Sequence, residues 1–169
     1  SMALNPHKNR TVTDLGAGEK DTGQYDHLDE VFGISGACVM YRASALADVR
    51  YNDEFFDHDF FAYKEDIDLA WRLRHAGWAA RVVPAAKAFH YRGMYGRELS
   101  GLWAKMGNRR KKSSTRNYYS TRNHWLMLLK NLRFSNGLIS MPRIFLHETL
   151  RFMYIAVLET RSLGAAIDV

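Results

Sequence analysis

A dense group of carboxylates lies between residues 55 and 68, in a stretch that is also rich in aromatic side chains. The acidic members of the group are Asp57, Asp59, Glu65, Asp66 and Asp68. Carboxylates beside aromatic rings are partly desolvated, which raises their pKa toward that of a useful general base. The stretch therefore offers a base that could deprotonate a hydroxyl group. The alternative is structural, because Asp and Glu in the first turn of a helix commonly cap it.

A single histidine follows this acidic group along the chain. His90 lies in a short extended piece after Pro84, where it could bind a divalent metal ion. It could equally be an ordinary surface or core histidine. The residues alone thus predict an acidic site near a histidine, with the choice between chemistry and structure left open.

Residues 31–41 are the first element that would position these groups. They form a nearly continuous apolar run with two glycines, which predicts a strand buried on both faces. Cys38, the only cysteine, lies in this run, so we expect a buried thiol. One thiol cannot form an intramolecular disulfide, which favours a reducing compartment.

Residues 65–75 are expected to form a helix that begins at the acidic group. Apolar side chains recur at helical spacing, acidic residues crowd the first turn, and basic residues occupy the last. Gly77 follows as a C-terminal stop. On this helix we expect Arg72 and Arg74 to face outward.

The rest of the chain predicts a short helix at 44–49, a strand at 78–82 and two longer helices at 115–132 and 142–159. The last helix contains an apolar run at 152–158 with polar residues on either side, and this run is too short to span a bilayer. It could lie on a membrane surface or pack against a core. Residues 1–30 are polar and predict a poorly ordered segment.

Charge and composition narrow the functional classes. The chain has 169 residues, 47% of them hydrophobic and 25% charged, as in a soluble globular domain, with a net charge of +6. The N-terminus lacks the apolar region of a secretory signal. Basic residues gather in one stretch, which predicts a phosphate-bearing partner or a solvated basic loop. They are Arg109, Arg110, Lys111, Lys112, Arg116 and Arg122.

Four ordered blocks carry a resemblance to a known family. The run FFDHDFFAYKEDIDLAWRLRHAGW at 55–78 resembles the signature of family 2 glycosyltransferases, and VVPAAKAFHYRG at 82–93 resembles the family's Val-Pro-x-Ala-x-x-x-His segment. GISGACVMYRASAL at 33–46 is similar to its Gly-x-x-x-x-x-Arg strand. RNYYSTRNHWLMLLKN at 116–131 is similar to its Tyr-Tyr-x-x-Arg-Asn helix. The resemblance is strongest to the bacterial rhamnosyltransferase-like branch.

The resemblance implies roles for individual residues. Asp66 would be the catalytic base, Glu65 would shape the acceptor pocket, and Asp68 would stabilise the helix start. His90 would be the third protein ligand of a divalent ion, Mn²⁺ or Mg²⁺, that holds the donor diphosphate. His58 departs from the family, which usually has Glu there, and this bears on acceptor specificity. The expected acceptor-binding residues are Asp57, Phe60, Phe61, Tyr63 and Trp71, and the expected diphosphate-binding residues are Arg116, Tyr118 and Arg122.

The resemblance also implies a fold class, α/β with an incomplete GT-A architecture. Residues 31–114 would form the acceptor and metal half, and residues 115–169 the C-terminal helices. The metal-binding Asp-x-Asp motif of the family should follow a hydrophobic strand. The segments Asp57–Asp59 and Asp66–Asp68 match the Asp-x-Asp pattern. The first lies in the aromatic loop and the second within the predicted helix, so neither follows a hydrophobic strand. We therefore expect the donor-binding half to be missing here and the isolated chain to be inactive.

The function predicted for the full-length enzyme is transfer of a sugar, with inversion, from a nucleotide-sugar donor to a glycan or lipid-linked acceptor in bacterial polysaccharide or glycan synthesis. A cytoplasmic location is expected, with peripheral contact at the inner face of the cell membrane as an option, and no nucleic-acid partner. Two alternatives remain open at this point, a non-catalytic binding module and a metal-dependent hydrolase that uses the acidic group.

Overall fold

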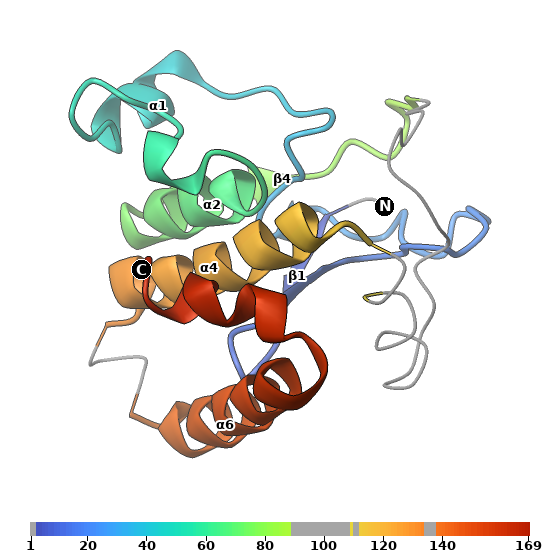
Figure 1. Ribbon diagram of the computed structural model, residues 1–169. Coiled ribbons are helices and arrows are strands. Elements are labelled where there is room, and N and C mark those ends of the chain that lie inside the picture. The colour runs from blue at the N-terminus through green and yellow to red at the C-terminus, as the bar shows by residue number, and fades with distance from the viewer. Residues whose placement is uncertain (1–2, 89–108, 110–111, 134–137) are drawn as a thin grey trace.

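The computed structural model describes residues 3–88, 109, 112–133 and 138–169. Helices and short strands are mixed along the chain (Figure 1). The strands are β1 Leu4–Pro6, β2 Val12–Asp14, β3 Glu30–Val31 and β4 Ala80–Arg81. The α-helices are α1 Ala43–Asp48, α2 Glu65–His75, α4 Ser114–Asn131 and α6 Met141–Leu158, and the 3₁₀ helices are η1 His58–Phe60 and η2 Thr160–Ala166.

The strands form two small antiparallel sheets. β1 pairs with β2, with Leu4 opposite Asp14, and β3 pairs with β4, with Glu30 opposite Arg81. The Leu4 amide also donates to the Gly33 carbonyl at 2.8 Å, which ties the first hairpin to the segment after β3. The structure thus differs from the expectation of a poorly ordered segment over residues 1–30, because a paired hairpin lies within it.

The strand predicted over residues 31–41 is wrong beyond its first residue. β3 ends at Val31, and Gly33 then comes so close to α2 that a Cβ on it would lie 2.5 Å from the Ala70 Cβ. After this contact the chain turns along the surface, and both Met40 and Cys38 are exposed. The expected buried thiol is therefore also wrong. Apolar composition alone could not distinguish a buried strand from a surface loop.

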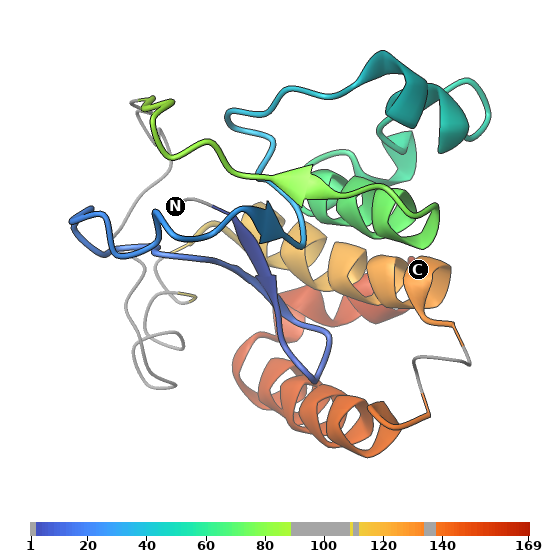
Figure 2. The same cartoon turned by 180° about the vertical axis from the view of Figure 1, so that it is seen from behind.

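The helical predictions are confirmed closely. α2 spans the expected residues, and Gly77 follows it with a φ of +87°. α1, α4 and α6 begin and end within one residue of the predicted bounds. Figures 1 and 2 show the strands on one side of α2 and α4, with η2 on the other side of α4. Within the described residues, none of these helices has the length and apolar character needed to cross a bilayer.

The hydrophobic core lies where the β1–β2 hairpin, α2 and α4 meet. Phe32 packs edge-on against Trp71, with ring centroids 4.9 Å apart. Partly buried side chains from β2 and α4 extend this cluster. Its buried members are Leu4, Phe60, Ile67, Ala70, Trp71 and Met127.

A buried polar contact joins α2 to α4 beside this core. The Asp68 carboxylate is fully buried and accepts hydrogen bonds from Arg72 Nε at 2.8 Å and Asn131 Nδ2 at 2.7 Å. Arg72 also donates to the Val49 and Phe55 carbonyls. The expectation that Arg72 faces outward is therefore wrong. Asp68 lies in the first turn of α2, as expected, and its side chain also accepts a hydrogen bond from Asn131 on α4. Arg72 belongs to α2 itself, so Asp68 contacts α4 through Asn131, while Arg72 compensates the buried charge of Asp68.

Candidate active site

The loop that leads into α2 has an unusual backbone. Phe61, Tyr63 and Lys64 have φ values of +54°, +73° and +72°, a region that side chains with a Cβ rarely adopt. Each such residue costs about 1–2 kcal/mol. A loop of this kind persists only where its surroundings hold it in place.

Asn123 on α4 holds this loop. Its side-chain amide is fully buried, and the two amide hydrogens are shared among the carbonyls of Phe60 at 2.7 Å, Ala62 at 2.8 Å and Tyr63 at 2.7 Å. The neighbouring Arg122 donates to the Asp59 carbonyl at 2.6 Å. α4 therefore fixes the backbone immediately before the acidic pair. No role was predicted for Asn123 from the sequence, although it lies in the Arg-Asn pair of the resemblance.

Asp66 lies at the start of α2 with its carboxylate anchored by backbone amides. One oxygen accepts from the Ile67 amide at 2.8 Å, and the other from the Gly36 amide at 2.9 Å. The second bond joins the start of α2 to the surface loop that follows β3. The carboxylate is half-buried, and its remaining lone pairs can accept a further proton or hydrogen bond.

Glu65 is half-buried beside Asp66, but its carboxylate has a different hydrogen-bonding environment. Its Oε2 atom is buried, and no hydrogen-bond partner for it is found in the described part of the chain. Burial raises the pKa of Glu65, and the negative charge of Asp66 adds to this effect. The two neighbouring carboxylates thus have distinct environments, as paired catalytic carboxylates often do.

Tyr41 lies close enough to this pair for the two charges to affect its pKa, and sequence reasoning gave it no role. Burial raises the pKa of its hydroxyl to about 12, with further contributions from the charges of Asp66 and Glu65. Its ring packs edge-on against Phe56, with centroids 6.2 Å apart. The hydroxyl therefore stays protonated next to two carboxylates and can donate a hydrogen bond. The incorrect assignment of residues 31–41 to a buried strand concealed this residue.

The residues expected to bind the acceptor separate into two groups. Phe61 is 77% exposed and stacks on Tyr119, and Tyr63 is half-buried beneath the Arg116 guanidinium. Both lie where a ligand could contact them. The other three are in structural positions: Phe60 and Trp71 are buried in the core, and Asp57 caps η1 and pairs with Lys130.

The residues expected to bind diphosphate lie along α4. Tyr118 and Arg122 are one turn apart and meet the same residue, since the Tyr118 hydroxyl donates to the Asp168 carboxylate and Arg122 Nε to the Asp168 carbonyl at 2.9 Å. Arg116 stacks on Tyr63 with its guanidinium carbon 5.4 Å from the ring centre. Tyr118 and Arg122 therefore lie close together, but in this structure both already bind within the fold, Tyr118 to the carboxylate and Arg122 to the backbone carbonyl of Asp168.

The predicted metal ligand and part of the basic stretch lie outside the described residues. His90 is among these, as are Arg110 and Lys111. Arg109 is described, and it forms a two-pronged ion pair with Glu159 at 2.8 and 2.6 Å. This arginine is therefore already engaged in a contact within the fold.

Comparison with known proteins identifies the family. Residues 13–166 match the family described as glycosyl transferase family group 2, and the chain belongs to it. The chain is also 41% identical over 59 residues to the N-acetylglucosaminyl-diphospho-decaprenol L-rhamnosyltransferases of two Mycobacterium tuberculosis strains, CDC 1551 / Oshkosh and ATCC 25618 / H37Rv. That match covers 35% of this chain and only 18% of either relative. No solved structure matches. The family 2, rhamnosyltransferase-like resemblance is confirmed.

Asn123→Ala should destabilise the protein by about 3 kcal/mol, because it leaves three loop carbonyls without their donor. Urea unfolding followed by circular dichroism measures this change. Leu129→Ala is the matched control on the same helix, since Leu129 is 72% exposed and its truncation should stay within about 0.5 kcal/mol. Equal losses in the two variants would contradict the role given to Asn123.

Proposed function

We propose that this chain carries the catalytic base and the acceptor side of an inverting glycosyltransferase. The observation that supports this most strongly is the Glu65–Asp66 pair, placed at the start of α2 by the loop that Asn123 holds. In a single displacement, the acceptor hydroxyl attacks the anomeric carbon from the face opposite the departing nucleotide. The carboxylate that accepts the hydroxyl proton must lie on the acceptor side.

Asp66 is the proposed base. Two backbone amides hold its carboxylate in one orientation, and lone pairs remain on its oxygens to take the proton of the acceptor hydroxyl. Glu65 and Tyr41 flank it and would orient the acceptor through hydrogen bonds. Phe61, which is exposed beside this loop, offers an apolar surface for a sugar ring.

The donor side stays a proposal that rests on the family resemblance. A divalent ion, Mn²⁺ or Mg²⁺, would neutralise charge on the leaving nucleoside diphosphate, with His90 as one of its ligands. Two segments of the described residues match the Asp-x-Asp pattern, but neither is suited to bind the metal ion. Asp68 already pairs with Arg72, and Asp57 already pairs with Lys130. We therefore assign the remaining ligands, and the nucleotide pocket, to sequence beyond this chain.

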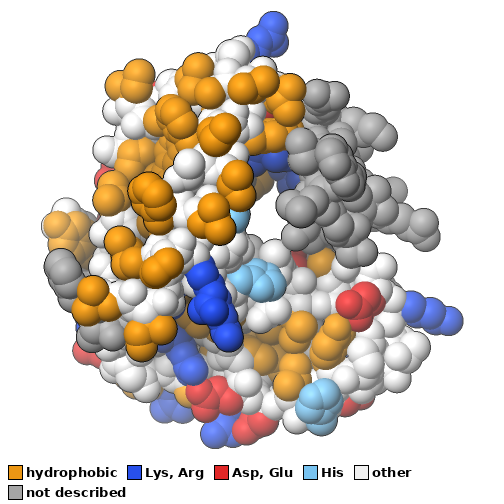
Figure 3. Space-filling model, turned by 90° about the horizontal axis from the view of Figure 1, so that it is seen from below, with side chains coloured by type: hydrophobic (Ala, Val, Ile, Leu, Met, Phe, Trp, Pro, Cys, Tyr) orange, Lys and Arg blue, Asp and Glu red, His pale blue; other side chains and the backbone are white. Residues whose placement is uncertain are grey.

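For the acceptor, we propose a lipid-linked sugar reached at the membrane surface. The relatives are named for a diphospho-decaprenol acceptor. Here α6 turns an unusually apolar face to solvent, visible in Figure 3, which views the molecule from the side where α6 lies. Such a helix can lie in the interface of a bilayer, and the net charge of +6 favours anionic lipids. Its exposed apolar residues are Met141, Phe145, Leu146, Leu150, Phe152, Met153, Val157 and Leu158.

Asp66→Asn should lower kcat by roughly 10²–10⁴-fold while donor affinity stays nearly constant, since only the proton acceptor is lost. Glu65→Gln should cost less and act partly through the acceptor KM. The measurement is sugar transfer by a form of the enzyme that includes the donor-binding half, with a panel of nucleotide sugars. Asp53→Asn, at an exposed ion pair with Arg50, is the control. Full activity of Asp66→Asn would refute the assignment, and equal turnover without acceptor would indicate a hydrolase.

Phe145→Glu should weaken binding to vesicles that contain phosphatidylglycerol by at least about tenfold, because it places a charge in the middle of the proposed membrane face. Co-sedimentation measures the bound fraction. Val83→Glu is the control, since Val83 is also exposed, at 64%, but does not lie on α6. Failure of the unmodified protein to bind, or equal binding by Phe145→Glu, would contradict the proposed contact of α6 with a membrane surface.

A further inference from the structure

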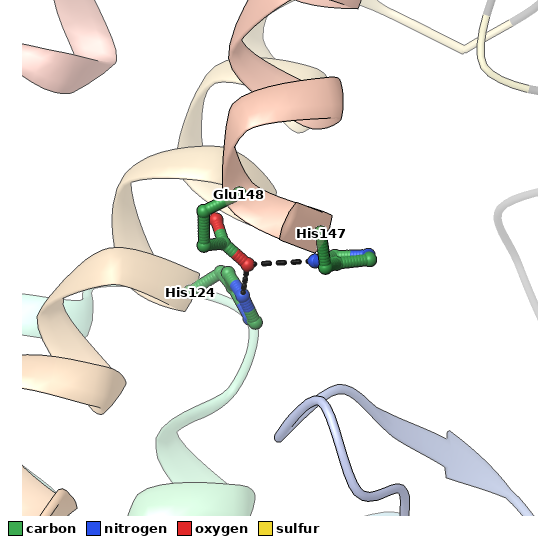
Figure 4. A group of neighbouring side chains, drawn as sticks. All are labelled: His124, His147 and Glu148. Atoms are coloured by element: carbon green, nitrogen blue, oxygen red, sulfur yellow. Dashed lines mark hydrogen bonds and ion pairs between the residues drawn. The ribbon is translucent and has the colours of Figure 1, made fainter. Parts of the chain in front are cut away.

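A second group of potential ligands lies between α4 and α6. His124 projects from α4, and His147 and Glu148 project from α6 (Figure 4). Among the described residues this is the one group of three or more histidine, cysteine or acidic side chains with metal-ligand spacing. Neither the resemblance nor the proposed reaction gives these residues a role.

The geometry of the group is convergent. His124 Nε2 lies 2.8 Å and His147 Nδ1 2.7 Å from the same oxygen, Glu148 Oε1, and all three atoms lie within 4.8 Å of one another. Ligand atoms of a tetrahedral zinc ion are about 3.4 Å apart at bond lengths near 2.1 Å. Small side-chain rotations would therefore open the group enough to admit an ion. Two imidazoles and one carboxylate form a typical zinc ligand set.

A divalent ion needs neutral imidazoles and an ionised carboxylate as its ligands. Burial and the charge of Arg151 lower the pKa of His124 to about 3, so its imidazole is neutral at neutral pH. Burial opposes ionisation of Glu148, but hydrogen bonds from His124 and His147 and the charge of Arg151 lower its pKa to about 2. On metal binding each imidazole proton would move to the other ring nitrogen, which leaves a lone pair toward the ion.

The surroundings orient the carboxylate and leave one side open. Trp125 Nε1 donates to Glu148 Oε2 at 2.7 Å, the kind of outer contact that fixes a ligand. The His124 side chain is only 1% exposed, whereas that of His147 is 32% exposed, so an ion can enter from the His147 side and keep a water ligand. Arg151 and Lys64 are close enough to lower the pKa of His124, and their charges limit the affinity for a cation.

We propose that His124, His147 and Glu148 bind a zinc ion that clamps α6 onto α4. This ion would be separate from the one expected at His90. Its role is structural, because it links a helix of the core to the helix with the apolar outer face. Holding α6 in place would fix the direction in which that face points.

The test is thermal unfolding of tag-free protein, first stripped with a chelator and then titrated with ZnCl₂. We expect the Tm to rise by about 5 °C or more once zinc exceeds its Kd roughly a hundredfold. His147→Ala should abolish the rise and still fold, because this side chain is partly exposed. Trp125→Phe should weaken zinc affinity by about 10–100-fold. Co²⁺ in place of zinc should give visible absorption bands in the unmodified protein only.

The matched control is His58→Ala, which removes an exposed histidine that pairs with a single carboxylate, Glu54. That variant should keep the full zinc-dependent rise. No rise in the unmodified protein, or the same rise in His147→Ala, would overturn the proposal. The readout is binding and stability, so failure here would leave the proposed glycosyl transfer untouched, and loss of transfer in Asp66→Asn would leave the zinc site untouched.

Discussion

The side-chain amide of Asn123 holds the backbone on which the candidate active site depends. Three carbonyls of the loop before α2 converge on this one group, and three residues of that loop have left-handed or otherwise disfavoured backbone angles. An irregular loop without such a donor would relax toward ordinary conformations. Glu65 and Asp66 follow directly, so their positions depend on a contact made from a helix that is distant in the sequence.

Two further polar contacts, one of them buried, extend this arrangement. Asp68 receives hydrogen bonds from Arg72 and Asn131, which fixes α2 against α4 one turn after the acidic pair. The Gly36 amide binds the Asp66 carboxylate and brings the surface loop with Tyr41 to the same place. Buried polar groups that are fully satisfied specify one geometry more strictly than apolar packing does. The site is therefore a product of long-range hydrogen bonds, and the core provides the platform beneath it.

The features that could be predicted from the sequence are those encoded by residues close together in the chain. Helix α2, its acidic start and Gly77 were predictable, because capping, charge order and periodicity all lie within a dozen residues. The contacts of Asn123, Asp68 and Arg72 were not, since they join residues about 20 to 60 positions apart. Tyr41 was missed because an apolar run was interpreted as a strand, and only Gly33 against Ala70 shows where the strand ends. The family could be identified without a structure, because four sequence motifs occur in the order that the family shows.

The central claim is that a left-handed turn, clamped by Asn123, presents the acidic pair. Comparing Lys64→Gly with Lys64→Ala by urea unfolding tests it most directly, because both variants lose the same charge and differ only in backbone freedom. At a φ of +72° the glycine variant should be the more stable by about 1 kcal/mol. In an ordinary helical or extended conformation the order reverses, since glycine then costs roughly 0.5–1 kcal/mol relative to alanine. A more stable alanine variant would contradict the account.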